Sequence, residues 1–354
     1  MNTGSIDLRS DTLSMPTSEM LHSIQTAALG DDSRDGDPTV MELEALAAEM
    51  MGKEAGLLNP SGTMSNLVAM RTHVEPGATV IVERSAHLYG AEIGGIAAAC
   101  GLLVLPVPGH YGAMDPEDLR RATKRVGTLF PTPGLVCLED THNAAGGTVI
   151  PPDRIGESAA LAREAGLAVH LDGARIFNAA VALGVDPREI TRHVDTVCFC
   201  LSKGLSAPIG SVLTGPKDFI DRARMVRRAL GGTLRQAGII AAPGLVALRG
   251  MVERLAEDHE NARVLAEGMA ALEGLHVDLR SVQSNIVNLD VGGLGIDAAT
   301  FARHLESRGV RGLPGLETVV RFVTYRGITL ESVRQALSTI RDLVATAPWG
   351  NRDG

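Results

Sequence analysis

The chain contains, at residues 197–204, the sequence Val197-Cys198-Phe199-Cys200-Leu201-Ser202-Lys203-Gly204, in which a single lysine follows an apolar, strand-like run. Water solvates an ammonium group poorly at such a position, and burial favours the neutral amine, which is a nucleophile. The alternative is an ordinary surface lysine beside a strand. Because Gly204 and Gly210 mark a turn directly after Lys203, we favour the nucleophile.

A second apolar run ends in an acid and a base, in the sequence Val169-His170-Leu171-Asp172-Gly173-Ala174-Arg175. A carboxylate beside the pyridine nitrogen of pyridoxal phosphate keeps that nitrogen protonated, and a guanidinium can hold the ring oxygen of the cofactor or a substrate carboxylate. Alternatively, Asp172 caps a helix and Arg175 pairs with it. Together with Lys203, these residues favour an enzyme whose lysine forms a Schiff base with pyridoxal 5'-phosphate.

Size and charge exclude several classes of protein. A chain of 354 residues exceeds the size at which one core usually stops growing, so we expect two domains. The net charge of −9 gives no attraction to nucleic-acid phosphates. No apolar run approaches the roughly 20 residues that span a bilayer, and residues 1–10 lack the apolar core of a signal peptide. We therefore expect a cytoplasmic protein that acts on small molecules.

The cysteines lie in apolar segments and have no histidine at the short spacing that is typical of zinc sites, at Cys100, Cys137, Cys198 and Cys200. Free cysteine behaves as a small buried hydrophobe. We expect reduced core residues and no metal.

Short β-rich runs alternate with helical patterns, at residues 79–83, 102–107, 135–139, 168–172, 196–201 and 211–214. This alternation predicts an α/β fold with a mostly parallel central sheet flanked by helices. Ligands of such sheets gather at the carboxyl ends of the strands. A helical pattern then runs from about residue 235 to 272. We place the boundary between a large domain (1–245, with an N-terminal arm 1–15) and a small C-terminal α+β domain (246–354) inside it.

Two helix starts carry local signals. Thr39 and Glu42 have the spacing of a capping box, and Gly52 suits the left-handed residue that ends such a helix. Residues 57–63 are interpreted as a turn that opens a new helix. The hydroxyls of Ser61 and Thr63 and the first backbone N–H groups, with Gly62 allowing close approach, can hold a phosphate at the positive end of that helix.

Two histidines lie near strand ends. His87 follows the predicted strand 79–83, where a flat imidazole can stack on a cofactor and relay protons, and His142 follows residues 135–139. A lone histidine is more often a surface residue or a hydrogen-bonded core residue. Both interpretations stay open at this point.

The chain resembles the low-specificity L-threonine aldolases, within the β-eliminating lyase group of fold-type I pyridoxal phosphate enzymes. The resemblance rests on five segments that occur in the family's order: Asp7-Leu8-Arg9-Ser10-Asp11-Thr12, Pro60-Ser61-Gly62-Thr63-Met64, His170-Leu171-Asp172-Gly173-Ala174-Arg175-Ile176-Phe177-Asn178, Phe199-Cys200-Leu201-Ser202-Lys203-Gly204-Leu205 and Gly231-Gly232-Thr233-Leu234-Arg235-Gln236-Ala237-Gly238. It extends from Ile6 to about Thr329.

The resemblance implies a role for each motif. Lys203 would be the Schiff-base lysine, Asp172 the partner of the pyridine nitrogen, and His87 would lie over the ring. The phosphate would be held by Ser61, Gly62, Thr63 and by Arg235, the last from a neighbouring subunit of a dimer-built tetramer. The substrate carboxylate would be bound by Ser10, Arg175 and Arg321.

Several positions depart from the family pattern. Arg34 replaces a tyrosine and could favour an acidic substrate, unless it pairs with Asp35 or Asp37. Leu129 stands in place of a histidine that handles the substrate hydroxyl, so His87 or a water would serve instead. Asp140 replaces an asparagine and Tyr325 a histidine.

The resemblance implies cleavage of a threonine-like β-hydroxy-α-amino acid to glycine and an aldehyde. The departures leave a second hypothesis open, a β-eliminating lyase, racemase or glycine transaldolase that acts on a related amino acid. A third is a cofactor-binding fold that has lost catalysis, against which the retained Lys203, Asp172 and Arg175 argue. The sequence does not give the preferred aldehyde, the configuration at Cβ or the oligomer size.

Overall fold

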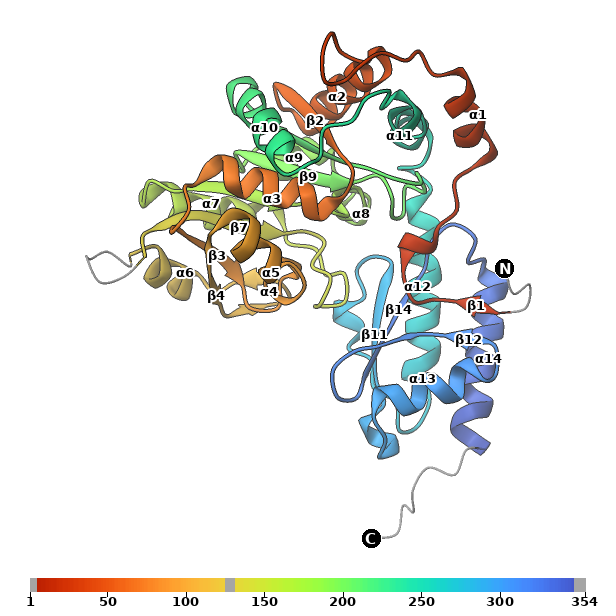
Figure 1. Cartoon of the computed structure of the whole chain (residues 1–354). Coiled ribbons are helices and arrows are strands. Elements are labelled where there is room, and N and C mark those ends of the chain that lie inside the picture. Colours follow the sequence, from red (N-terminus) through yellow and green to blue (C-terminus); the bar gives the residue numbers. More distant parts are fainter. Residues whose placement is uncertain (1–4, 125–130, 347–354) are drawn as a thin grey trace.

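The computed structural model describes residues 5–124 and 131–346 (Figure 1). Leu129, one of the positions that depart from the family pattern, lies outside these residues. No helix in the described ranges combines the length and the apolar character that a bilayer-spanning segment needs.

A seven-stranded sheet forms the centre of the larger part, with the strand order β2-β10-β9-β8-β7-β3-β4. The strands are β2 (Ala55–Asn59), β3 (Thr79–Glu83), β4 (Leu103–Val107), β7 (Pro133–Glu139), β8 (Ala168–Asp172), β9 (Thr196–Cys200) and β10 (Ser211–Gly215). Only β10 runs antiparallel to its neighbours among these pairs. The predicted mostly parallel sheet is confirmed.

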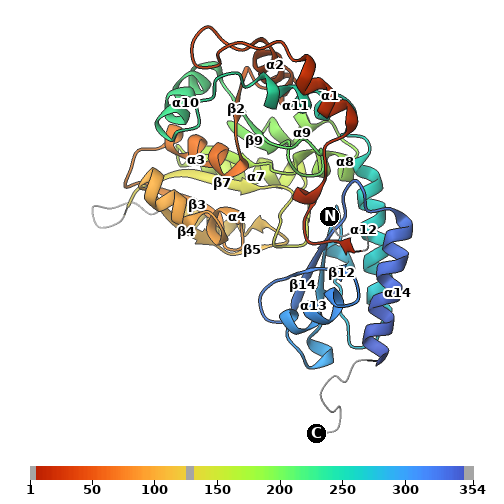
Figure 2. The same ribbon diagram turned by 45° about the vertical axis from the view of Figure 1, so that its right-hand side comes forward.

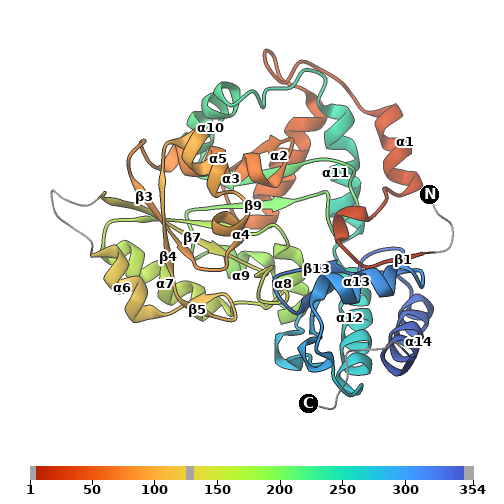
Figure 3. The same cartoon turned by 60° about the horizontal axis from the view of Figure 1, so that its bottom comes forward.

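Neighbouring apolar residues of one strand enter different cores, because successive side chains point to opposite faces of a sheet. Leu57 packs with helices α3 (Gly62–His73) and α10 (Lys217–Ala229), whereas Leu58 packs on the opposite face. That opposite face is covered by α2 (Pro38–Met51), α6 (Pro116–Thr123), α7 (Pro152–Glu164) and α8 (Ile176–Leu183). Figure 3 shows α3 and α10 on one side of the sheet and α6 and α7 on the other. Burial of both faces explains the continuous apolar runs.

The predicted turn at residues 57–63 is partly wrong. Leu57 and Leu58 belong to β2, which pairs with β10, and the turn begins only at Pro60. Only two apolar residues lie between a glycine and Asn59, which is too few for a recognisable strand pattern. Pairing with the distant strand β10 makes this segment a strand. The helix predicted to follow is present as α3.

The predicted capping box at Thr39 is wrong. The N-cap of α2 is Asp37, two residues earlier, and Pro38 takes the first helical position. The buried carboxylate of Asp37 accepts from the backbone N–H groups of Thr39 and Val40 and also from those of Gly30 and Gly238. Proline suits this position because the first helical N–H has no partner anyway. The predicted left-handed Gly52 is confirmed, with φ of 61°.

The helical pattern over residues 235–272 is two helices, α11 (Gly238–Gly250) and α12 (Leu255–Ala270). The prediction of one long helix is therefore wrong, and Gly250, a poor helix former, stands at the break. After α12 comes a small antiparallel sheet of β11 (Ile286–Asp290), β14 (Val319–Val323) and β13 (Leu313–Pro314), with α13 (Ala298–Glu306) and α14 (Leu330–Thr346). The domain boundary at residue 245 stays a prediction.

The N-terminal segment lies against this C-terminal part (Figure 2). Strand β1 (Ile6–Asp7) pairs in parallel with β12 (Val310–Arg311), and Leu8 joins the apolar cluster that α12, α13 and α14 form. The chain then crosses to the larger part, where α1 (Ser18–Thr26) packs on α11. The remaining short strands and helices are α4 (His87–Gly90), α5 (Ile93–Gly95), α9 (Pro187–Thr191), β5 (Gly109–His110) and β6 (Ala113–Met114).

Candidate active site

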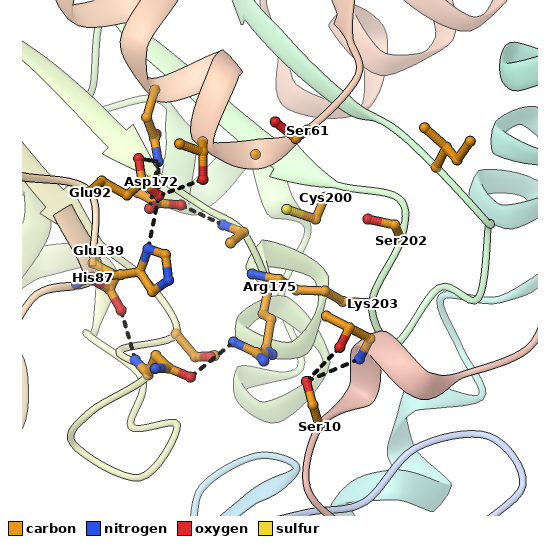
Figure 4. Close-up of a pocket in the computed structure, with 18 of the residues that line it drawn as sticks. Ser10, Ser61, His87, Glu92, Glu139, Asp172, Arg175, Cys200, Ser202 and Lys203 are labelled. Atoms are coloured by element: carbon orange, nitrogen blue, oxygen red, sulfur yellow. Dashed lines mark hydrogen bonds and ion pairs between the residues drawn. The ribbon is translucent and has the colours of Figure 1, made fainter. Parts of the chain in front are cut away.

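A cavity of about 380 Å³ lies at the carboxyl ends of β8 and β9 and at the N-terminus of α3 (Figure 4). Most of the site residues predicted from the sequence line it: Ser10, Ser61, Gly62, Thr63, His87, Asp172, Arg175, Lys203 and Arg321. His142, Arg34 and Arg235 do not. The cavity is where an α/β sheet is expected to bind its ligand.

Lys203 is half-buried in the loop that follows β9. No hydrogen bond or salt bridge joins its Nζ atom to another residue in the described part of the chain. Two other lysines are engaged: Nζ of Lys53 donates to the carbonyl oxygens of Thr191 at 2.9 Å and Val194 at 2.5 Å, and Nζ of Lys217 lies 2.8 Å from Asp221. Lys203 thus offers an amine that no protein group occupies.

Asp172 is buried at the end of β8. Its Oδ2 accepts from the Asn66 side-chain amide at 2.9 Å and its Oδ1 from the backbone N–H of Ala174 at 3.1 Å. No lysine or arginine of the described residues forms an ion pair with it, so the alternative of an Arg175–Asp172 pair is wrong. Because a buried carboxylate without a cation is costly, the position suits a protonated pyridine nitrogen.

Arg175 instead forms a two-point salt bridge with Asp11, with Nε–Oδ2 and Nη2–Oδ1 distances of 2.6 and 2.8 Å. Burial raises the pKa of Asp11, but the charge and hydrogen bonds of Arg175 outweigh it and hold that pKa at about 2. The pair fixes Arg175 and leaves only part of its guanidinium for a ligand. A local pattern could not reveal Asp11, which lies 164 positions away.

The guanidinium of Arg321 is less engaged by protein groups than that of Arg175. Its Nη1 donates to Oδ1 of Asn143 at 2.9 Å, and its buried Nε has no partner among the described residues. Arg175 Nη1 lies 3.4 Å from the same oxygen. Burial and the neighbouring charge of Arg175 lower the pKa of Arg321. Two cations that share one neutral acceptor form a binding place for a carboxylate.

His87 begins α4, and its backbone N–H donates to Glu139 at 2.6 Å. Its Nδ1 lies 2.8 Å from Oε1 of Glu92, and this hydrogen bond raises the pKa of His87 against the effect of burial. Glu92 also accepts from the hydroxyl of Thr63 at 3.2 Å. Glu92 could not be identified from the sequence, since a carboxylate five residues after a histidine matches no helix or strand spacing.

The ligand atoms of His87, Glu92 and Asp172 all lie within 4.8 Å of one another. They are the one group of a metal-binding type that the described residues contain. Of these three residues, His87 and Glu92 are already hydrogen-bonded to each other.

The N-terminus of α3 closes one end of the cavity. Ser61 is its N-cap and accepts from the N–H of Met64 at 3.2 Å. A Cβ atom on Gly62 would lie 2.7 Å from Sγ of Cys200, so only glycine fits without a shift. The first N–H groups of the helix can therefore approach an anion closely, as a phosphate requires.

Three predicted residues lie elsewhere. His142 is fully buried with Nε2 3.2 Å from Oε2 of Glu83, so the structure does not place it in the substrate cavity as predicted. The side chain of Arg34 is 79% exposed and pairs with Asp31 at 3.6 Å, not with Asp35 or Asp37. Arg34 and Arg235 line a separate depression together with Ser33, Arg228 and Thr233.

Two of the positions that depart from the family pattern are buried outside the cavity lining. The hydroxyl of Tyr325 donates to the carbonyl oxygen of Asp7 at 2.8 Å. Oδ1 of Asp140 accepts from the N–H of Ile150, and burial raises the pKa of Asp140 to about 8. Asp140 therefore keeps its proton near neutral pH, where it stands in for a neutral amide.

The sequence pattern of the family described as beta-eliminating lyase matches residues 7–291. The chain belongs to this family. It is therefore a pyridoxal phosphate-dependent lyase, as the sequence predicts, and the cavity residues fit that cofactor: an unoccupied amine, a buried acid without a cation and an open helix N-terminus.

Relatives of this lyase match nearly its whole length. It is 38% identical to low-specificity L-threonine aldolase 1 of Arabidopsis thaliana over 347 residues, which cover 97% of each chain. It is 39% identical to the low specificity L-threonine aldolase of Escherichia coli (strain K12) over 341 residues, 96% of this chain and 99% of the relative. The chain thus also belongs to the low-specificity L-threonine aldolase family, which confirms the resemblance.

A solved threonine aldolase of Leishmania major has the same fold, with a TM-score of 0.81 at 18% identity, over 96% of this chain and 99% of that chain. At this identity the likeness concerns the fold alone.

We predict that Gly62→Ala weakens the binding of pyridoxal phosphate about tenfold or more, because the new methyl group overpacks against Cys200. Absorbance titration of the purified protein measures this affinity. The double variant Gly62→Ala/Cys200→Ala should recover most of the loss, since the sulfur is then gone. Equal affinities for Gly62→Ala and the wild type would contradict a close approach at this glycine.

We predict that Asp140→Asn gains stability relative to the wild type as the pH rises from 5 to 8. The pKa of Asp140 is about 8 in the folded state against an ordinary value of 3.8, so across that window the unfolded carboxyl is ionised while the folded one keeps its proton, and the wild type loses stability as the pH rises. The slope is of the order of 1 kcal/mol per pH unit. Urea unfolding at several pH values measures it.

The matched control is Asp186→Asn, at an exposed residue whose pKa is lowered to about 2 by Arg188. The difference in free energy of unfolding between Asp186→Asn and the wild type should stay constant between pH 5 and 8. A flat difference for Asp140→Asn as well would show that Asp140 is ionised in the folded protein.

Proposed function

We propose that this protein cleaves a threonine-like β-hydroxy-α-amino acid to glycine and an aldehyde, with pyridoxal 5'-phosphate as cofactor. One observation carries the proposal: Lys203, with no protein partner in the described residues, and Asp172, a buried acid without a cation, line the same cavity. The names of the relatives that cover nearly the whole chain support the reaction.

We assign the cofactor contacts as follows. Lys203 would provide the amine that binds the aldehyde group, Asp172 would hold the ring nitrogen, and His87 would contact the ring. The N-terminus of α3, with Ser61, Gly62 and Thr63, binds the phosphate. Bound in this way, pyridoxal phosphate supplies the electron sink for the carbon–carbon bond that breaks.

Arg321, with Ser10 and the remaining donor of Arg175, binds the substrate carboxylate. A two-point contact between a guanidinium and a carboxylate fixes orientation as well as position. With the cofactor bound, the orientation that these residues impose on the substrate would decide which of its bonds breaks. The Asp11–Arg175 salt bridge holds this end of the site rigid.

His87 is the base that removes the proton of the β-hydroxyl group. Glu92 binds Nδ1, which fixes the tautomer and leaves Nε2 available for the proton. A water molecule held by His87 would do the same at longer range.

The direct experiment is release of glycine from L-threonine, L-allo-threonine and phenylserine by the purified protein with pyridoxal phosphate. We expect glycine and the matching aldehyde in equal amounts. Lys203→Ala should lose both the activity and the absorbance band of the bound cofactor. Pyruvate or D-amino acids without glycine would favour elimination or racemisation, and no cofactor band in the wild type would favour a fold without catalysis.

We predict that Glu92→Gln moves the acidic limb of kcat/KM to lower pH. The Glu92 carboxylate raises the pKa of His87, so the neutral imidazole that takes the proton appears only at higher pH in the wild type. Removing the charge lowers that pKa. The pH profile of glycine release measures the shift, and His87→Asn should abolish the limb. An unchanged limb in Glu92→Gln would exclude His87 as the base.

We further propose a homo-oligomer, built from dimers as a tetramer, in which Arg235 of one copy contacts the phosphate in its neighbour. In support, Arg235 and Arg34 are exposed and line a depression separate from the cavity, so both side chains are open to a neighbouring copy. Arg34 would then lie near the neighbour's substrate. Sedimentation of the purified protein as a monomer would contradict this.

We also propose a cytoplasmic location. The four cysteines are all free and buried, as is usual in a reducing compartment. Fractionation that finds the protein outside the cytoplasm would exclude it.

A further inference from the structure

A chain of polar side chains, all buried except the half-buried last member, runs from the cavity to the far end of α3, and the proposed reaction uses none of its remote members. Asn66 lies on α3, His170 on β8 and Thr196 on β9, and each is at most 1% exposed. The distance from Asn66 Oδ1 to His170 Nε2 is 3.2 Å, and that from His170 Nδ1 to Thr196 Oγ1 is 2.9 Å. His73, at the end of α3, continues the chain with Nε2 2.8 Å from the same hydroxyl.

The carboxylates at the cavity end set the donors and acceptors of this chain. The Nδ2 atom of Asn66 faces Oδ2 of Asp172 at 2.9 Å and both Glu92 oxygens at 3.4 Å. Ionised carboxylates only accept, so the amide must turn its NH2 group to them and its oxygen to His170. His170 must then donate from Nε2.

The remaining hydrogen bonds follow because the imidazole ring of His170 is neutral. Burial lowers the pKa of His170 to about 4, so Nδ1 has no proton at neutral pH and accepts from the Thr196 hydroxyl. Burial also lowers the pKa of His73 to about 3, and its Nε2–H donates to Thr196. Cys198 adds a second donor to the Asn66 oxygen, with an S···O distance of 3.1 Å. In every link of the chain from His73 to Asp172, the donor is the residue farther from the cavity.

We propose that His73, Thr196 and His170 act as a positioning chain that locks the Asn66 amide, so that one side chain of α3 holds both Asp172 and Glu92. This rests on the proposed function, in which Asp172 faces the ring nitrogen and Glu92 orients His87. The helix that carries Asn66 also presents Gly62 and Thr63 to the phosphate. Asn66 therefore fixes the phosphate end of the site relative to the ring-nitrogen end.

The consequence of a flipped Asn66 amide shows why its orientation matters. If Asn66 turned over, its carbonyl oxygen would face two carboxylates in a water-poor interior, where such contacts are costly. The opposite tautomer of His170 would favour that flip, because its Nε2 would then need a donor. The Thr196 hydroxyl, which donates to Nδ1 in the arrangement above, stabilises the tautomer that prevents this flip.

Thr196→Val tests the chain, since it removes the hydroxyl and keeps the shape of a residue that does not line the cavity. The matched control is Thr214→Val, at an equally buried threonine of the same sheet whose hydroxyl donates to the carbonyl oxygen of Val197 at 3.3 Å. Two readouts are independent of turnover: the tautomer of His170 by nitrogen-15 NMR of the cofactor-free protein, assigned with His170→Gln, and the dissociation constant of pyridoxal phosphate.

We expect Thr196→Val to lose the single Nε2–H tautomer of His170 and to weaken cofactor binding about fivefold, the effect of one hydrogen bond. Thr214→Val should keep the wild-type tautomer and affinity. Identical results for the two variants would overturn the proposal and reduce the chain to ordinary packing.

Asn66→Asp is the second variant, should Thr196→Val fail to fold. It keeps the shape but places a carboxylate oxygen against Asp172 and Glu92, so cofactor binding should weaken by more than tenfold, and unchanged binding would overturn the proposal. The proposed function fails separately, if the wild type releases no glycine. The tautomer in the cofactor-free protein remains measurable in that case.

Discussion

The carboxylate of Asp172, buried at the end of β8 without a cation in the described part of the chain, is the constraint on which the rest of the site depends. Two hydrogen bonds hold it, one from Asn66 and one from the backbone of Ala174. These bonds satisfy its oxygens but do not balance its charge. A cationic ring nitrogen does, which ties the acid, the cavity and the amine of Lys203 to one cofactor.

The other charges in the cavity are arranged around this acid without neutralising it. Arg175 forms a salt bridge with Asp11, and His87 is hydrogen-bonded to Glu92, so neither side chain pairs with Asp172. Arg321 keeps a buried Nε without a partner in the described residues. The cavity thus separates a place for a cation, at Asp172, from a place for an anion, at Arg321, as a cofactor and an amino-acid substrate require.

The parts of this arrangement that depend on strand ends could be predicted from the sequence. Lys203 and Asp172 each follow an apolar run, and the carboxyl ends of neighbouring strands meet at one edge of the sheet. His142 also follows a strand but does not line the cavity, because a strand end gives the edge of the sheet but not the direction in which a side chain points. Asp11 and Asn66 were out of reach, since their partners Arg175 and Asp172 lie 164 and 106 positions away.

Borohydride reduction of the purified protein with pyridoxal phosphate, followed by peptide mass spectrometry, tests the central claim most directly. Reduction fixes the cofactor to the amine that binds it. The account predicts that the modified peptide carries the cofactor on Lys203. Labelling of Lys53, Lys124 or Lys217 with Lys203 unmodified would contradict it.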